Sequence, residues 1–157
     1  MSPDDARAAL LRCCGSRRWA DAMTARRPFA SADDMLRAAD AIWAGVDRAD
    51  WLEAFAAHPR IGDLESLRKK FAATADWARG EQAGVGGADE EMIRALAEGN
   101  REYEAKFGQI FIVCATGKTA AEMLGILRGR LANDAETELR IAAAEQAKIS
   151  RLRLEKL

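Results

Sequence analysis

Apolar residues recur at intervals of three and four positions through most of the chain, which is the spacing of a helix with one buried face. Residues 2–5, with the sequence SPDD, supply an N-cap residue, a proline at the first helical position and two acids in the first turn. Ser31 precedes a similar pair of acids, and Asn133 with Glu136 three residues later has the form of a capping box. The pattern predicts helices over residues 2–13, 17–26, 31–43, 50–58, 64–71, 88–107, 119–131 and 133–157.

Two segments interrupt this pattern. Residues 80–87 hold four glycines in eight positions, which predicts a turn or a flexible segment. Residues 109–114 form the one strand-like run, but a lone strand has no neighbour to pair with its backbone. We therefore expect a buried extended segment or the start of a helix there. The predicted fold class is all-α: a single compact multi-helix bundle of about seven to nine helices, with residues 1–157 as one domain.

Composition and charge exclude several classes of protein. The length of 157 residues suits one domain with a substantial core. Because 24 basic residues are balanced by 25 acidic ones with mixed signs along the chain, a nucleic-acid partner is not expected. No apolar run approaches the roughly 20 residues that cross a bilayer, so no membrane span is expected. With no targeting signal in the sequence, the predicted location is cytoplasmic.

The cysteines and the histidine argue against a metal site. The three cysteines, Cys13, Cys14 and Cys114, are an odd number, and the first two are adjacent, which suits a reducing compartment. The chain has one histidine and no Cys-x-x-Cys pair. A zinc site made by this chain alone is therefore not expected.

His58, the only histidine, is the first candidate for chemistry. It ends a predicted helix, is followed by Pro59, and opens the sequence HPRIGD at residues 58–63. Imidazole changes charge near neutral pH, so it suits general acid or base work. The alternative is a structural histidine that interacts with the helix dipole. Glu81 and Gln82 could present an acceptor and a donor to a polar heterocycle, or they could be ordinary residues of a solvated loop.

Arg153 is the second candidate because of its position on the last predicted helix. It continues a stripe formed by Leu139, Ala142, Gln146 and Ile149. An arginine at the end of such a stripe either extends its head group to solvent or meets an anion in a partly buried site. Arg151 lies off this stripe and is interpreted as a surface residue. The sequence Gly117-Lys118-Thr119 resembles the end of a phosphate-binding P-loop, but Ile112 stands where that loop requires a glycine.

Several segments together resemble the 2-oxo-4-hydroxy-4-carboxy-5-ureidoimidazoline (OHCU) decarboxylase family. The most specific is HPRIG at residues 58–62. The others, in order, are CGSRRW at 14–19, Trp77 with Glu81-Gln82, FIVCA at 111–115, and Lys148-Ile149 with Arg153-Leu154. Their order and spacing cover nearly the whole chain. One departure is Ala78, where the family commonly has a hydroxyl residue after the tryptophan.

The resemblance implies a fold, an activity and a set of site residues. It implies an all-α homodimer that decarboxylates the ureidoimidazoline carboxylate to (S)-allantoin without a metal or an organic cofactor. It implies that His58 and Glu81 are the catalytic acid/base pair and that Gln82 and Arg153 hold the substrate. The other substrate-binding residues that it implies are Pro59 and, through main-chain groups, Phe111, Ile112 and Val113.

Two other functions are compatible with parts of the sequence. A non-catalytic helical interaction domain accounts for the helices and the mixed charge, but not for the arginine on the stripe or the histidine before proline. A helical nucleotide-binding protein rests on Gly117-Lys118-Thr119 alone.

Overall fold

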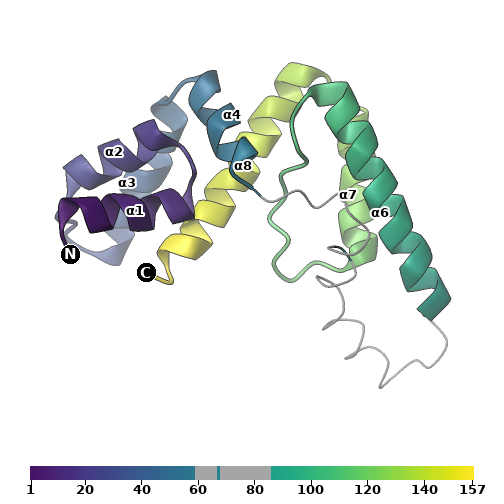
Figure 1. The fold of residues 1–157 in the computed structure, drawn as a ribbon, viewed down its shortest axis with the longest axis horizontal. Helices are drawn as coiled ribbons and strands as arrows, with labels where there is room; N and C mark the ends of the chain where they lie inside the picture. The colour runs from purple at the N-terminus through teal and green to yellow at the C-terminus, as the bar shows by residue number, and fades with distance from the viewer. Residues whose placement is uncertain (59–66, 68–85) are drawn as a thin grey trace. The chain divides into compact units, whose positions relative to one another are not determined.

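The computed structural model describes residues 1–58, 67 and 86–157. The described residues contain helices and irregular segments but no strand, which confirms the predicted all-α fold class (Figure 1). Their helices are α1 (Pro3–Cys13), α2 (Arg17–Arg26), α3 (Ala32–Gly45), α4 (Arg48–Ala56), α6 (Gly86–Phe107), α7 (Ala120–Leu131) and α8 (Ala135–Leu154). The predicted helix at 64–71 and most of the predicted turn at 80–87 lie outside the described residues, although Leu67 is buried.

A serine or threonine side chain caps the N-terminus of four of these helices. Ser2, Ser16, Ser31 and Thr119 each accept a hydrogen bond from the backbone N–H three residues later, at 3.0–3.2 Å. These bonds satisfy donors that have no partner within the helix itself. The starts of α1, α2, α3 and α7 are therefore fixed locally by the sequence.

Three predicted helix starts were wrong by one or two residues. Helix α6 begins at Gly86, and not at Ala88, so Gly86 and Gly87 of the predicted turn belong to the helix. Helix α4 begins at Arg48, and not at Asp50, because Asp47 is its N-cap and the Asp50 side chain accepts from the Asp47 backbone. Helix α8 is capped by Asp134, whose carboxylate accepts from the Thr137 backbone at 2.7 Å. Asn133, the predicted cap, donates instead to Glu138 at 3.2 Å. At α4 and at α8 two candidate caps lie within three residues of each other, and the caps used are Asp47 and Asp134.

The described chain divides into two compact units. The first contains residues 1–58, 112–114 and 139–157, and the second takes its described residues from positions 67–111 and 115–138. The prediction of a single domain over residues 1–157 stays a prediction.

Tryptophans join the helices of the first unit. Trp19 of α2 is buried, and its indole N–H donates to the Ala39 carbonyl of α3 at 3.1 Å. Trp43 of α3 donates in the same way to the Ala143 carbonyl of α8 at 2.8 Å. Each ring buries a large apolar surface while its indole N–H donates to a backbone carbonyl of the next helix. The two hydrogen bonds therefore fix how α2 lies along α3 and how α3 lies along α8.

Gly15 allows the α1–α2 junction to approach the end of α4. A Cβ atom built on Gly15 would lie 2.4 Å from the Cβ of Ala57, well inside van der Waals contact. The backbone of Gly15 is not in the left-handed region, so space alone requires the glycine. Ala57 precedes His58, so this contact places the first candidate residue.

A buried charged cluster links the helices of the second unit. Arg130 of α7 pairs with Glu138 of α8, and both side chains are almost fully buried. Tyr103 of α6 donates to the same carboxylate at 2.6 Å. The Tyr103 ring also lies against Phe107 and Phe111, at centroid distances of 4.7 and 5.2 Å. The cluster thereby connects three helices and one irregular segment through a single carboxylate.

Replacing Arg130 with Met should destabilise the protein by about 3–5 kcal/mol, because the buried Glu138 carboxylate loses its cation. Urea unfolding followed by circular dichroism measures the change. The matched control is Arg94→Met in α6, which removes a largely exposed pair with Glu90 and should cost no more than about 0.5 kcal/mol. Equal stabilities of the two variants would contradict a stabilising role of the buried Arg130–Glu138 pair.

Candidate active site

His58 lies at the C-terminal end of α4. Its backbone N–H donates to the Phe55 carbonyl at 3.2 Å, which continues the last turn of the helix. Its side chain is half-buried, and its Nε2 is hydrogen-bonded to the Oε1 atom of Gln146 on α8. The ring is therefore held between two helices of the first unit.

The surroundings of His58 favour its neutral form. Burial lowers the pKa of His58 below its ordinary value of 6.5, the hydrogen bond to Gln146 raises it, and the charge of Arg153 lowers it further. The net direction is downward. At neutral pH the imidazole is consequently uncharged and able to accept a proton, as a general base must be.

Arg153 lies on the last turn of α8 and is exposed. Its Nη1 donates to the backbone carbonyls of Arg12 and Cys13, at 3.3 and 3.5 Å, where α1 ends. These carbonyls carry the negative end of the helix dipole, so they hold the cation in place. Within the described residues the remaining guanidinium donors have no hydrogen-bond partner. They can therefore meet a carboxylate in the bidentate arrangement that arginine favours.

The strand-like run is irregular in the structure, in agreement with the expectation that it forms no sheet. Ile112 is buried and Val113 is half-buried in the first unit. The Cys114 backbone N–H donates to Glu145 of α8 at 3.1 Å, which attaches this segment to the helix that also holds His58. Phe111 belongs to the second unit, where the Arg130 guanidinium carbon lies 4.6 Å from its ring centre.

The structure therefore describes part of the predicted site. His58, Ile112, Val113 and Arg153 belong to one unit, and Arg153 acts electrostatically on His58. The predicted residues Pro59, Glu81 and Gln82 lie outside the described residues, as does Ala78.

Gln146 is a residue of this site that the sequence did not single out. The helical pattern placed it on the buried stripe of α8 without a role, and the structure buries it completely. Its partner His58 lies 88 positions away in the sequence, so no local pattern connects the two. The available signal was an amide in the middle of an apolar stripe, since a buried amide requires a polar partner.

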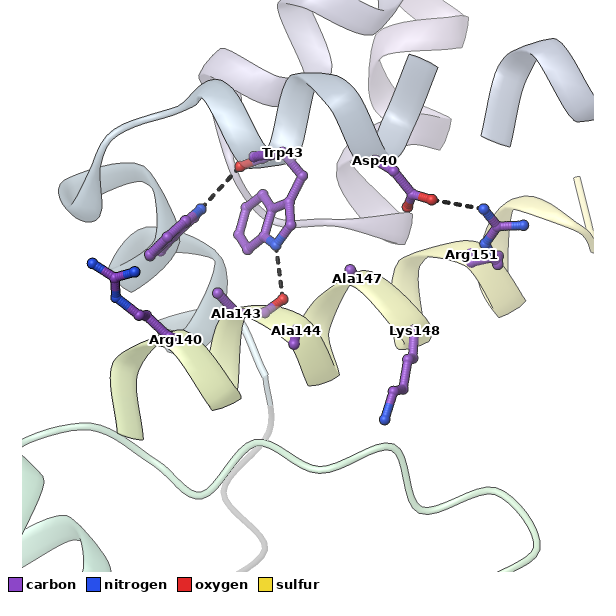
Figure 2. A pocket seen from close by; sticks show the side chains of 10 residues that line it. Asp40, Trp43, Arg140, Ala143, Ala144, Ala147, Lys148 and Arg151 are labelled. Atoms are coloured by element: carbon purple, nitrogen blue, oxygen red, sulfur yellow. Dashed lines mark hydrogen bonds and ion pairs between the residues drawn. The ribbon is translucent and has the colours of Figure 1, made fainter. Parts of the chain in front are cut away.

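A separate hollow of about 410 Å³ lies in the first unit (Figure 2). Trp43 and three alanines of α8 form its apolar wall, and the figure shows the Trp43 indole above the Ala143 carbonyl that it contacts. Arg151 pairs with Asp40 at its rim, at 2.6 Å. None of the predicted site residues that the structure describes lines this hollow.

Among the described residues, no group of three or more His, Cys, Asp or Glu side chains is arranged to hold a metal ion. The helices of the described residues include none that is both long and apolar enough to cross a membrane.

The fold and the surroundings of His58 define an all-α protein whose single histidine is hydrogen-bonded to a buried glutamine and has its pKa lowered by burial and by the charge of an arginine. Residues 1–155 match the sequence model of the OHCU decarboxylase family, and the chain belongs to that family.

Individual relatives agree with this assignment. The chain is 42% identical over 149 residues to the uric acid degradation bifunctional protein TTL of Arabidopsis thaliana, a match that covers 92% of this chain and 45% of the plant protein. The chain thus spans less than half the length of this relative. It is 30% identical over 138 residues to the 2-oxo-4-hydroxy-4-carboxy-5-ureidoimidazoline decarboxylase of Amia calva, covering 87% of this chain and 77% of that protein.

A solved structure matches over almost the whole chain. It is a crystal structure of an OHCU decarboxylase in the presence of (S)-allantoin. The TM-score is 0.76 and the identity 37%, with 99% of this chain and 97% of the other covered. The resemblance and the fold class predicted from the sequence are thereby confirmed.

The pKa of His58 should lie below 6.5, and Arg153→Gln should raise it, because the variant removes a positive charge that disfavours the imidazolium. Since His58 is the only histidine, its ring protons can be followed by one-dimensional NMR against pH without assignment. Arg151→Gln, which removes a charge from the same helix, is the control and should leave the titration unchanged. A His58 pKa that is insensitive to Arg153 would show that the two side chains are not close.

Proposed function

We propose that this protein decarboxylates OHCU to (S)-allantoin, without a metal or an organic cofactor. The observation that carries the proposal is a neutral, half-buried His58 beside Arg153 in a chain that belongs to the OHCU decarboxylase family along residues 1–155. Further support comes from the likeness to a crystal structure of an OHCU decarboxylase in the presence of (S)-allantoin.

In this proposal His58 and Glu81 form the acid/base pair, while Arg153 and Gln82 hold the substrate. The neutral imidazole supplies a base, and Arg153 supplies a fixed cation for a carboxylate. Pro59 and the main chain at residues 111–113 complete the binding residues. The attachment of Cys114 to Glu145 supports a defined position for residues 112–114, as a binding segment requires.

The substrate carries a carboxylate and a hydroxyl on the same ring carbon, next to a C=N bond. When the carbon–carbon bond to the carboxylate breaks, CO2 leaves and its electron pair forms a C=C bond within the ring. The electrons of the C=N bond move to nitrogen, which takes up a proton. The substrate is thus its own electron sink, and this explains why no cofactor is required.

The remaining steps are proton transfers. The hydroxyl loses its proton as the carbonyl of allantoin forms, and the neighbouring ring carbon receives a proton on one face. His58 and Glu81 position and deprotonate the hydroxyl, and one of them returns the proton. Arg153, anchored on the end of α1, fixes which face of the ring meets the pair. The contribution of the protein is therefore largely orientation and stereocontrol.

The proposed assembly is a homodimer, which follows from the family resemblance, and the proposed location is the cytoplasm. Size-exclusion chromatography with light scattering tests the dimer directly. A monomer that is fully active would remove the homodimer from the proposal and leave the chemistry intact.

The test of the function is circular dichroism during urate breakdown. OHCU is generated in the cuvette by urate oxidase and hydroxyisourate hydrolase, with and without this protein. Rapid growth of the (S)-allantoin signal that depends on the protein is the expected result. A trace identical to spontaneous decay, with folded protein, would reject the decarboxylase and favour the non-catalytic interaction domain.

Variants then test the residues. His58→Asn should lower kcat by about 10²- to 10⁴-fold, which is the usual contribution of a general acid or base. Arg153→Gln should raise KM, because it removes a contact to the substrate carboxylate. Arg151→Gln is the matched control, since Arg151 lies on the same helix but pairs with Asp40. If Arg151→Gln and Arg153→Gln had equal kinetics, Arg153 would not bind the substrate.

A further inference from the structure

Gln146 is buried in the first unit and uses both ends of its amide. Its Oε1 atom faces His58 Nε2, and its Nε2 donates to Ser150 Oγ at 3.0 Å. Ser150 lies one turn further along α8 and is hydrogen-bonded to the thiol of Cys14. The amide oxygen therefore faces the imidazole, and the amide nitrogen faces a buried hydroxyl.

This orientation has a chemical consequence for the imidazole. An amide oxygen has no hydrogen to donate, so the hydrogen between Gln146 Oε1 and His58 Nε2 must be carried by the histidine. In a neutral imidazole only one nitrogen carries hydrogen. If Nε2 carries it, Nδ1 has the free lone pair.

We infer that Gln146 is a positioning residue that holds neutral His58 as its Nε2–H tautomer and so makes Nδ1 the proton-accepting atom of the proposed reaction. The second half of this inference rests on the proposed function, whereas the tautomer is a property of the folded protein alone. Gln146 touches no reacting atom in this scheme. It acts through His58 by fixing the ring orientation and the nitrogen that bears the hydrogen.

The other groups around His58 do not determine which of its ring nitrogens carries the hydrogen. The charged side chain that acts on it within the described part of the chain is Arg153 of α8, which disfavours the imidazolium and forms no recorded hydrogen bond with the ring. At the α1–α2 junction, burial raises the pKa of Cys14 to about 11, so the thiol at the end of the network is neutral at physiological pH. Cys13, beside it, also has a raised pKa because of burial.

A purely structural Gln146, which only joins α8 to α4, predicts different behaviour. Such a role requires no change in the tautomer of His58 in any variant that folds, and no fall in its pKa in Gln146→Met. A positioning role predicts opposite shifts in two variants. Gln146→Met removes the acceptor and should lower the pKa of His58, while Gln146→Glu keeps an acceptor, adds a negative charge and should raise it.

The experiment is two-bond ¹H–¹⁵N correlation NMR on protein labelled with ¹⁵N-histidine. Because the chain has one histidine, the spectrum contains a single pair of ring nitrogens and needs no assignment. Above the pKa, the wild-type protein should show a protonated Nε2 and an unprotonated Nδ1. Gln146→Met should give a mixture of tautomers. Gln146→Glu should retain Nε2–H and extend the doubly protonated form to higher pH.

Gln109→Met is the matched control for the chemical change, because Gln109 belongs to the second unit and contacts Tyr103. Its histidine spectrum should equal that of the wild type. Far-ultraviolet circular dichroism establishes that each variant is folded, and Gln146→Glu keeps the test decisive if Gln146→Met does not fold. A wild-type Nδ1–H tautomer, or the wild-type pKa and tautomer in a folded Gln146 variant, would overturn the inference.

Kinetics separate this inference from the proposed function. If the protein forms (S)-allantoin, Gln146→Met should lower kcat by roughly 10- to 100-fold with little change in KM, as is usual for a group that orients a reacting partner. The acidic limb of the pH profile should move to higher pH in Gln146→Glu. If the tautomer is as inferred but no allantoin forms, the proposed function fails and the positioning of His58 stands.

Discussion

The buried polar side chains of α8 place the functional segments of the first unit, because each of them requires a partner inside the protein. A buried amide or carboxylate without a hydrogen bond costs several kcal/mol, in the range of about 2–7 for an amide. Gln146 meets this requirement through His58, and Glu145 meets it through the Cys114 backbone. Among the described residues, no buried side-chain nitrogen or oxygen lacks a hydrogen-bond partner. One helix thereby fixes a histidine from the first half of the chain and a segment from the second.

The same requirement explains which parts of the architecture could be predicted from the sequence. The starts of α1 and α3 follow from Ser2 and Ser31, whose hydrogen bonds are confined to one helical turn. The predicted starts of α4 and α8 were wrong because each helix has two nearby candidate caps, Asp47 and Asp50 at α4 and Asn133 and Asp134 at α8. The choice of Asp134 depends on Asn133 being engaged by Glu138, a contact that belongs to the buried cluster with Arg130.

The sequence was sufficient to pick out reactive residues of the candidate site, but not to show which residues contact one another there. His58 could be recognised because it is the single histidine, and Arg153 because a charge ends an apolar stripe. Gln146 could not be recognised as their neighbour, since its role arises only when α4 and α8 pack together. The roles of Glu81 and Gln82 rest on the family resemblance, and Phe111 belongs to a different unit from Ile112 and Val113.

Gly15 is required for the space that it leaves and not for its backbone conformation. Its backbone would accept any residue, but the space beside Ala57 accepts none larger than glycine. A substitution there would displace the residue next to His58, so it would disturb the proposed catalytic histidine from a position outside the predicted site. A screen that measured activity alone would therefore group Gly15 with the catalytic residues. The role of Gly15 is to leave space for Ala57.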